Sequence, residues 1–465
     1  MSDFQVILCV LDIKSNTLKP ILCRVLLYSV PGFPKPTIIQ SKFSSLLGEL
    51  NVFNILLIIF IFGFLLIFFS VLFFLNNELS KKILISFISI LITIYFINPF
   101  LYFITERNDI SKLRYKEAKK QNIFYDKRTR LDVIKDFKKQ NQEAFPVIPP
   151  TGFYKRFKGK YNFLPLGGVS NVLTVHCNES GSWTSYISDE YGFNNKRINF
   201  NSDSKKKVLI VGDSFAQGAC VSQDESISGQ LTKKGIETKT LGMDGNGPLA
   251  ALASIKEYSK EIKPNIIIWL VFDNDLGDLE RELKNPILKN YLDISYSQNL
   301  IIRKKKINDI LIKEISKKYS KNENKIKNFL NKSISLFYIR KLIGLTKNNL
   351  EKKEVKNKKK LFDELEKTIF LMKNLSENLN ADFKIVYIPD ILKFKKTEYT
   401  TSNPSHLFDI KDFEEILKNT NVAWLNFYQI MLDSKNPLSF YPFRLKGHLT
   451  PEGYKILAKE IQNFL

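Results

Sequence analysis

A serine follows a short apolar run near the middle of this 465-residue chain, where a hydroxyl could act as a nucleophile. The run is KVLIVG, residues 207–212, and Asp213 and Ser214 come directly after it. A β-branched run that ends in glycine is typical of a strand buried on both faces. Open α/β sheets bind ligands at the carboxyl ends of their strands. Ser214 is therefore predicted at such an end, either as a nucleophile or as the polar start of a helix.

Three further segments place polar groups at predicted strand ends or helix starts. LGMDGNGP supplies Gly242, Gly245 and Gly247, FDND supplies Asn274, and HLTPEGY supplies His448. Acyl transfer through a serine needs a base within hydrogen-bond reach and donors aimed at the tetrahedral oxyanion. A histidine can be that base, and glycine N–H groups and an Asn amide can be those donors. The four segments together therefore indicate a serine nucleophile more strongly than any one of them does.

In this order the segments resemble the four sequence blocks of the SGNH, or GDSL-type, hydrolases, which are named after a Ser, a Gly, an Asn and a His. The resemblance covers residues 207–465. The segment SDEYGFNN, residues 188–195, is similar to one often found just upstream in bacterial members. The resemblance implies a flavodoxin-like three-layer α/β fold with a parallel sheet, and an activity on ester bonds.

The resemblance also implies a role for each residue. Ser214 would be the nucleophile, and His448 would be the general base and then the general acid. The Ser214 N–H, the Gly245 N–H and the Asn274 side chain would form the oxyanion hole. No metal and no organic cofactor is implied.

Other residues of these segments are expected to have alternative or structural roles. Gly242 and Gly247 remain rivals of Gly245, because the block is rich in glycine. Asp213 and Asp275 are expected to shape turns rather than to catalyse. Cys220 is a poor rival nucleophile, because it lies deeper in the segment after Ser214.

The chain departs from the family at the acid that orients the histidine. The family commonly has an Asp three residues before the His, and some members have an acid two before it. Leu445 and Lys446 occupy these positions, and neither accepts a proton from imidazole. A backbone carbonyl or an acid elsewhere could fill the role, or it could be unfilled, which would give a slow or inactive enzyme.

Strands that alternate with helices argue for a parallel, doubly wound sheet. A helix should follow Ser214, and Thr450 and Pro451 are suited to the cap and first turn of the last one. Strands are expected at 207–212, 238–243, 264–272, 383–389 and 422–427, and helices at 248–262 and 451–465. Residues 277–382 are expected to be a basic helical insertion in the 207–465 domain.

Two charge-free runs near the N-terminus are long enough to span a membrane as helices. They are Val52–Leu75 and Ile83–Ile104, joined by a short linker, so residues 51–104 are predicted to form a two-pass hairpin anchor. The remaining parts are a region of unclear order, a charged stalk and a lead-in of short strands and turns, at residues 1–50, 105–150 and 151–206 respectively.

Two features of the sequence give opposite indications of the membrane side on which the C-terminal domain lies. Lys and Arg flank the hairpin on both outer sides, which by the positive-inside rule favours a cytoplasmic domain. The family resemblance favours a periplasmic or extracellular domain, because bacterial members joined to membrane segments often act on acylated carbohydrates of the cell envelope.

The charge and the cysteine content limit the classes of partner and site that the chain is expected to have. The formal net charge is +23, but no compact basic motif interleaved with aromatic residues stands out, which argues against nucleic acid as a partner. The insertion could face anionic lipid or an acidic polymer. The four cysteines form no C-x-x-C pair and indicate neither a zinc site nor a disulfide framework. They are Cys9, Cys23, Cys177 and Cys220.

We therefore expect a membrane-anchored serine esterase that acts on an acylated small molecule or glycan, with membrane lipid as a partner through the hairpin. It would cleave or transfer a small acyl group such as acetyl on an alcohol. One alternative is a carbohydrate O-acyltransferase that uses the same acyl-enzyme. Another is a non-catalytic scaffold of the same fold that binds an anionic polymer, which the residues before His448 would favour.

Overall fold

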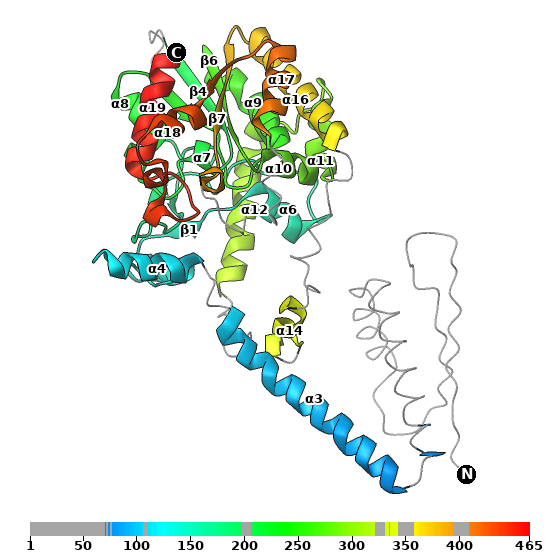
Figure 1. The fold of residues 1–465 in the computed structure, drawn as a ribbon. Coiled ribbons are helices and arrows are strands. Elements are labelled where there is room, and N and C mark those ends of the chain that lie inside the picture. The colour runs from blue at the N-terminus through cyan, green and yellow to red at the C-terminus, as the bar shows by residue number, and fades with distance from the viewer. Residues whose placement is uncertain are drawn as a thin grey trace, which may run out of the picture. The chain divides into compact units, whose positions relative to one another are not determined.

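The computed structural model describes residues 70, 73–74, 77–105, 110–196, 206–320, 331–333, 335–342, 358–394 and 409–465. They fall into two units, residues 1–93 and residues 94–465. The second unit contains the α/β domain (Figure 1). The region 1–50 and nearly all of the predicted first span, Val52–Leu75, lie outside the described residues.

The central sheet has five parallel strands in the order β5-β4-β6-β7-β8. By chain order this is 2-1-3-4-5, the flavodoxin-like arrangement, whose ligand crevice lies between the first and third strands. The parallel α/β sheet expected from the sequence is confirmed. Its strands are β4 (Lys207–Gly212), β5 (Glu237–Thr240), β6 (Ile266–Phe272), β7 (Asp382–Ile388) and β8 (Ala423–Asn426).

Helices cover both faces of this sheet, because alternate side chains of its strands are buried on opposite sides (Figure 1). Leu209 and Val211 of β4 join the larger core, with α9 (Pro248–Ile262) and α16 (Lys358–Asn378). Val208 and Ile210 join the other core, with α8 (Ile227–Lys233) and α19 (Pro451–Phe464). The result is a three-layer domain.

One helix differs clearly from the expectation. The helix expected after Ser214 is split into α7 (Ser214–Gln217), η2 (Gln223–Glu225) and α8. Helix α9 has the expected bounds, and Thr450 caps α19 by accepting from the Gly453 N–H. The other helices of this part are α10 (Asp275–Glu282), α11 (Pro286–Lys289), η3 (Asn290–Leu292), α12 (Leu300–Ser320), α14 (Phe337–Leu342), η4 (Ile391–Lys393), α17 (Ile410–Thr420), α18 (Phe427–Asp433), η7 (Pro437–Phe440) and η8 (Pro442–Arg444).

The expected insertion is partly built into the domain. Helix α16 is the crossover between β6 and β7, and Leu365 and Ile369 on it are fully buried in the larger core. Helix α12 also buries one side in that core, through Leu311 among others. A parallel connection needs a helix to cover the sheet, so α16 belongs to the fold rather than to an insertion.

The segment before the sheet is also folded. Residues 110–139 hold two helices where a charged stalk was expected, and residues 151–206 contain the short strands expected there. The segment contains α4 (Ile110–Lys120), α5 (Arg130–Lys139) and α6 (Pro150–Phe157). It also contains a small sheet in the order β1-β2-β3, where β1 pairs parallel to β2 and β2 pairs antiparallel to β3. These strands are β1 (Ala144–Pro146), β2 (Leu173–Val175) and β3 (Ser185–Ile187).

Among the described residues, one helix is long and apolar enough to cross a membrane. It is α3 (Asn77–Thr105), with a candidate span at Asn77–Leu101 in which 6% of an apolar window of 18 residues is buried. The linker expected between two spans is therefore helical from Asn77 onward. The two-span hairpin is not confirmed.

Candidate active site

Ser214 lies at the end of β4 and is the first residue of α7. The turn before it requires glycine, because Gly212 has φ +143° and an added Cβ would lie 2.7 Å from the Leu270 carbonyl oxygen. Asp213 then accepts a hydrogen bond from the Phe215 N–H and caps the short helix. Strand, turn and cap together place the Ser214 hydroxyl at the carboxyl edge of the sheet.

His448 reaches Ser214 from the loop before α19. Its Nε2 lies 2.8 Å from the Ser214 Oγ, although the two residues are 234 positions apart in the chain. The imidazole ring packs on Phe215, with ring centroids 5.0 Å apart. The structure therefore brings together the serine and the histidine that the sequence singled out.

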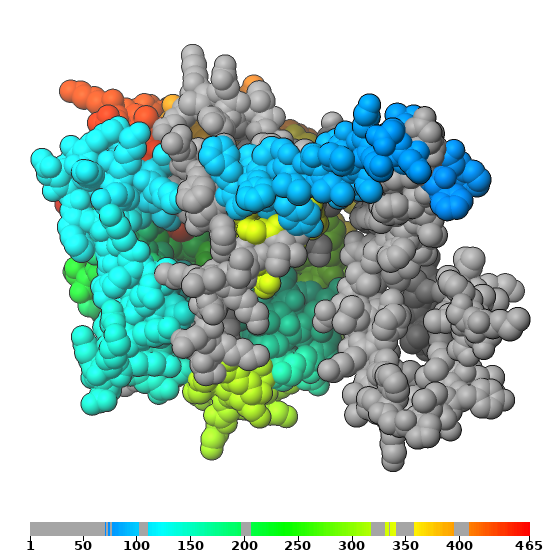
Figure 2. Space-filling model, turned by 90° about the horizontal axis from the view of Figure 1, so that it is seen from below, coloured from blue at the N-terminus to red at the C-terminus, as the bar shows by residue number. Residues whose placement is uncertain are grey.

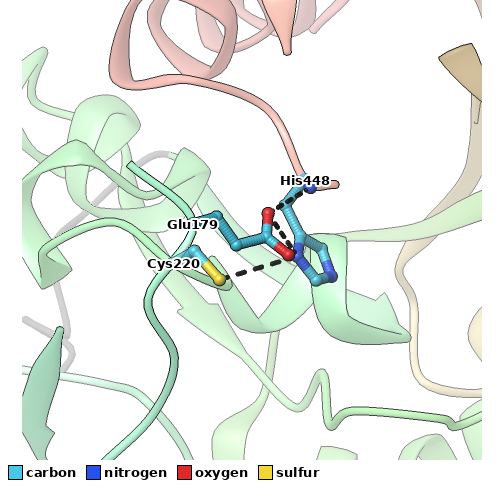
Figure 3. A group of neighbouring side chains, drawn as sticks. All are labelled: Glu179, Cys220 and His448. Carbon is cyan, nitrogen blue, oxygen red and sulfur yellow. Dashed lines mark hydrogen bonds and ion pairs between the residues drawn. The ribbon is translucent and has the colours of Figure 1, made fainter. Parts of the chain in front are cut away.

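An acid that the sequence analysis did not identify stands on the other side of the imidazole. A Glu179 carboxylate oxygen, Oε2, lies 3.3 Å from His448 Nδ1 and accepts the His448 backbone N–H at 2.6 Å. Figure 3 shows this carboxylate beside the ring. Glu179 lies in the connection between β2 and β3, 269 positions before His448. No local pattern around the histidine could have pointed to it.

Arg114 of α4 fixes the carboxylate of Glu179. Its Nη2 lies 2.9 Å from Glu179 Oε1 and donates to the Lys446 carbonyl oxygen at 2.7 Å. The residue between Lys446 and His448 is glycine for a steric reason. A Cβ at Gly447 would lie 2.5 Å from Glu179 Oε2 and 2.9 Å from Arg114 Nη2. The absence of a side chain at Gly447 therefore leaves room for the ion pair.

The charges of the site reinforce one another. Burial alone would lower the pKa of His448, but attraction to Glu179 and the hydrogen bond with it raise that pKa above its ordinary value. Burial alone would raise the pKa of Glu179, but His448 and Arg114 lower it to about 2. Glu179 is therefore an anion at every pH at which His448 titrates, and it can orient the imidazole and stabilise an imidazolium.

A disulfide joins Cys177 to Cys220 beside the site. It links the connection that carries Glu179 to the loop after α7, across 43 positions of sequence. The sequence indicated no disulfide framework among the four cysteines, and the structure shows a disulfide at this pair. The two cysteines lie in loops that follow strands of different sheets, so nothing in their spacing along the chain indicated that these loops would meet.

One group of three side chains among the described residues is close enough to hold a metal ion: Glu179, Cys220 and His448, with candidate atoms within 4.8 Å (Figure 3). The Cys220 sulfur is in a disulfide and is not the thiolate that metals prefer. Glu179 and His448 already bind each other. These side chains fit a Ser–His–acid triad better than a metal centre.

The structure distinguishes the three candidate glycines by their N–H groups. The Gly242 N–H donates to Thr240 Oγ1, and the Gly247 N–H donates to Glu282 Oε1. Among the described residues, the Gly245 N–H has no acceptor, and neither does the Ser214 N–H. An oxyanion donor needs an N–H that is not already bonded, so Gly245 is the one of the three candidate glycines that fits this requirement.

Asn274 lies two residues after β6, the strand that pairs with β4 on the side opposite β5. It is the N-cap of α10 but makes no side-chain capping bond, and its buried Oδ1 has no hydrogen-bond partner among the described residues. Since β4 and β6 are neighbours, Asn274 and Ser214 lie at the same edge. Its amide is therefore not engaged in holding the helix.

The two aspartates of these blocks accept backbone hydrogen bonds within turns. Asp213 accepts from Phe215, and Asp275 Oδ2 accepts from the Phe272 N–H at 3.0 Å. Burial raises the pKa of Asp213 to about 7 and also raises that of Asp275.

The upstream segment SDEYGFNN holds the serine block in place. Asn194 Nδ2 donates to the Gln217 carbonyl oxygen at the end of α7. Asn195 bonds both the N–H and the carbonyl oxygen of Thr240 at the end of β5. The segment thus connects α7 to the edge strand of the sheet.

No protein-family model and no curated protein matches the chain. Among solved structures it is similar to a GDSL-like lipase from Bacteroides thetaiotaomicron, at 12% identity over 57% of this chain and 90% of that one, with a TM-score of 0.30. It is similar to a lipase/acylhydrolase from Enterococcus faecalis, at 14% identity over 56% and 94%, with a TM-score of 0.27. It is also similar to an acetylxylan esterase from Geobacillus stearothermophilus, at 13% identity over 56% and 94%, with a TM-score of 0.29.

The first of these is named as a GDSL-like protein, the class that the four sequence blocks resemble. Their identities and TM-scores are too low to support a statement about the chemistry of this chain. That chemistry is derived from the contacts of Ser214, His448 and Glu179.

Proposed function

We propose that the chain is a membrane-anchored serine esterase that removes, or transfers, a small acyl group such as acetyl on an alcohol, for example on a carbohydrate of the cell envelope. One observation carries the proposal: the Ser214 hydroxyl lies 2.8 Å from His448 Nε2, and the opposite ring nitrogen faces the Glu179 carboxylate at 3.3 Å. These are the contacts that a serine nucleophile and its base require.

In the proposed mechanism, the Ser214 hydroxyl transfers its proton to His448 Nε2 while Oγ attacks the ester carbonyl. Glu179 accepts a hydrogen bond from Nδ1–H and stabilises the imidazolium that forms. The Ser214 N–H, the Gly245 N–H and the Asn274 amide would donate to the oxyanion. The imidazolium returns the proton to the departing alcohol, and the acyl group remains on Ser214. Water, or an acceptor alcohol in a transferase, then repeats the sequence in reverse.

The disulfide supports a domain outside the cytoplasm. Cys177 and Cys220 are bonded, and such bonds persist in oxidising compartments. This favours the envelope side that the family resemblance suggests, over the side favoured by the positive charges around the membrane segment.

The proposal is tested with the full chain in detergent and phenyl acetate as substrate. Ser214→Ala should lower kcat/KM by about 10⁵-fold or more, because removal of the nucleophile removes the whole covalent route. Ser439→Ala, at an exposed serine far along the chain, is the matched control and should keep full activity. A fluorophosphonate should label the unmodified chain and fail to label the Ser214 variant.

Equal rates for the Ser214→Ala variant and the unmodified chain would contradict the proposal. Addition of an alcohol acceptor then separates the two reactions. Ping-pong dependence on the acceptor concentration indicates a transferase, and release of acetate alone indicates a hydrolase.

A further inference from the structure

Helix α4 connects the candidate site to the membrane segment. On its buried side, Arg114 binds Glu179 and the carbonyl oxygen of Lys446, and Ala118 is fully buried. An aromatic chain adds to this contact: Tyr115 packs on Tyr125, which packs on Phe443 beside the His448 loop. Helix α4 therefore forms one wall of the active-site edge.

The turn after α4 supports the Glu179 connection in the same way. The Asp126 N–H donates to the Gly181 carbonyl oxygen at 2.7 Å, and Asn178 Nδ2 donates to the Asp126 carbonyl oxygen. A Cβ at Gly181 would lie 2.2 Å from the Phe124 carbonyl oxygen, so the two backbones are in direct contact. The backbone of this turn thus faces the acid of the site.

The side chains on the outside of α4 and its turn are apolar and basic. Phe124 is 73% exposed, and Ile123 and Leu113 are exposed as well. The exposed lysines of α4 are Lys112, Lys116, Lys119 and Lys120. Large apolar side chains interspersed with lysine are the composition of a helix that lies in the headgroup layer of a membrane. Figure 2 views the side of the domain where the residues after α3, in cyan, form a broad part of the surface.

The chain length keeps this surface near the membrane. The candidate span ends at Leu101, and Ile110 begins α4. Helical residues up to Thr105 and extended residues from there allow at most about 24 Å between Leu101 and Ile110. A second connection starts in the span itself, where Asn98 is fully buried and its Oδ1 accepts the N–H groups of Tyr338 and Ile339.

We propose that α4 and its turn lie on the surface of the membrane that α3 enters, so that the site takes acyl esters presented on membrane-anchored molecules. The substrate class rests on the proposed esterase function. The carboxyl edge of the sheet, with α7 and the start of α19, lies on the α4 side of the domain, away from the C-terminus (Figure 1). An ester held in the headgroup layer is therefore on the same side as Ser214.

The test uses the full chain in vesicles of phosphatidylethanolamine and phosphatidylglycerol. Phenyl acetate in solution is compared with 4-hexadecyloxyphenyl acetate, which carries the same ester on a membrane anchor. Both should be hydrolysed. Phe124→Asp should leave the phenyl acetate rate unchanged and lower the rate on the anchored ester by about tenfold, because it removes one apolar contact with the bilayer. The matched control is Phe370→Asp, at a phenylalanine of α16 that is 53% exposed, and it should change neither rate.

A second measurement does not depend on catalysis. Phe124→Cys and Phe370→Cys are each labelled with bimane in a chain that also carries Cys9→Ser and Cys23→Ser. Lipids with a nitroxide headgroup should quench the bimane fluorescence at position 124 and leave the fluorescence at position 370 unchanged.

The outcomes separate the two proposals. Hydrolysis of phenyl acetate without hydrolysis of the anchored ester would overturn this inference and leave the esterase standing. Hydrolysis of neither ester would remove the esterase, and the quenching result would still decide whether α4 lies on the membrane. Equal quenching at both positions would overturn that placement.

Discussion

The two halves of the candidate site come from different parts of the molecule. The half with Ser214, Gly245 and Asn274 stands on the parallel sheet, and each of these residues follows a strand of that sheet. The half with Glu179 and Arg114 comes from the small sheet and from α4, which precede the parallel sheet in the chain. His448 lies between the halves and bonds to both. The sheet half has the groups that would react, and the other half has the groups that would orient the base.

The largest expected effect on the orienting half is that of Glu179→Gln. A neutral amide stabilises an imidazolium much less than a carboxylate does, so kcat should fall by about 10³- to 10⁴-fold. The pH profile supplies a second readout. The neutral imidazole is the active form, so the rate rises with pH through the pKa of His448, which Glu179 raises. Loss of the carboxylate lowers that pKa, and the acid limb of the profile should move to lower pH.

Glu143→Gln is the matched control, at an exposed glutamate of the same N-terminal segment, and should leave rate and profile unchanged. Glu179→Gln leaves the buried Arg114 without its carboxylate, so the variant's melting temperature is measured alongside. A folded Glu179→Gln chain with an unchanged acid limb would show that Glu179 is not the partner of His448 in the reaction.

The reacting half is tested by Asn274→Ala. Loss of one oxyanion donor lowers kcat by about 10²- to 10³-fold in serine hydrolases, with little change in substrate binding. No side-chain hydrogen bond holds α10 through Asn274, so the variant should fold as the unmodified chain does. Single-turnover kinetics with phenyl acetate would show a slower acylation step. A loss confined to KM would instead place Asn274 in substrate binding.

The positions of Ser214, Gly245 and Asn274 after strands of the sheet were predictable, because short sequence patterns mark where those strands end and helices begin. A buried strand such as β4 shows as a short β-branched run, and a glycine or polar residue marks its end. The helix ends that position the site were equally predictable, for example at Pro248 and Thr450. Local composition thus contained most of what was needed to place Ser214 and His448.

The orienting half could not be predicted in this way, because its contacts depend on tertiary packing. Glu179 looks like any other glutamate in a polar turn, and Arg114 like any other cation in a basic stretch. Residues 105–150 were predicted to be a stalk because their charges are numerous, yet Arg114 is buried in an ion pair. Only the fold brings these charges together, and the space at Gly447 is visible only beside them.

Gly447→Ala tests whether the ion pair of Glu179 and Arg114 needs the space that the missing side chain of Gly447 leaves. Its φ is not in the left-handed region, so alanine is allowed by the backbone and only the neighbours resist it. A methyl group there must displace the Glu179 carboxylate by a fraction of an ångström or more. A misplacement of about 1 Å can cost up to about 100-fold, so we expect a fall in kcat of about 10- to 100-fold.

Gly277→Ala is the control for this substitution, because a Cβ at Gly277 meets nothing within 4 Å. It should retain full activity. The acid limb of the Gly447→Ala profile should move toward that of Glu179→Gln, which a purely structural fault elsewhere would not produce. A Gly447→Ala chain with unchanged kcat and an unchanged profile would show that Glu179 does not need this exact position.

The smallest expected effect on activity concerns the disulfide, which links the connection that carries Glu179 to the loop after α7. In the double variant Cys177→Ser, Cys220→Ser, the contacts of Glu179 with Arg114 and His448 remain, so kcat should fall by less than about tenfold. Stability should respond more, because a closed loop of 43 positions is expected to contribute about 4 kcal/mol. The double variant should therefore unfold at a lower urea concentration, and dithiothreitol should shift the unmodified chain in the same direction.

The matched control is the double variant Cys9→Ser, Cys23→Ser, which removes the same number of sulfur atoms and should change neither kcat nor the unfolding midpoint. A fall in kcat as large as that of Glu179→Gln would mean that the disulfide, rather than Arg114, fixes the acid, and that the two halves form one unit.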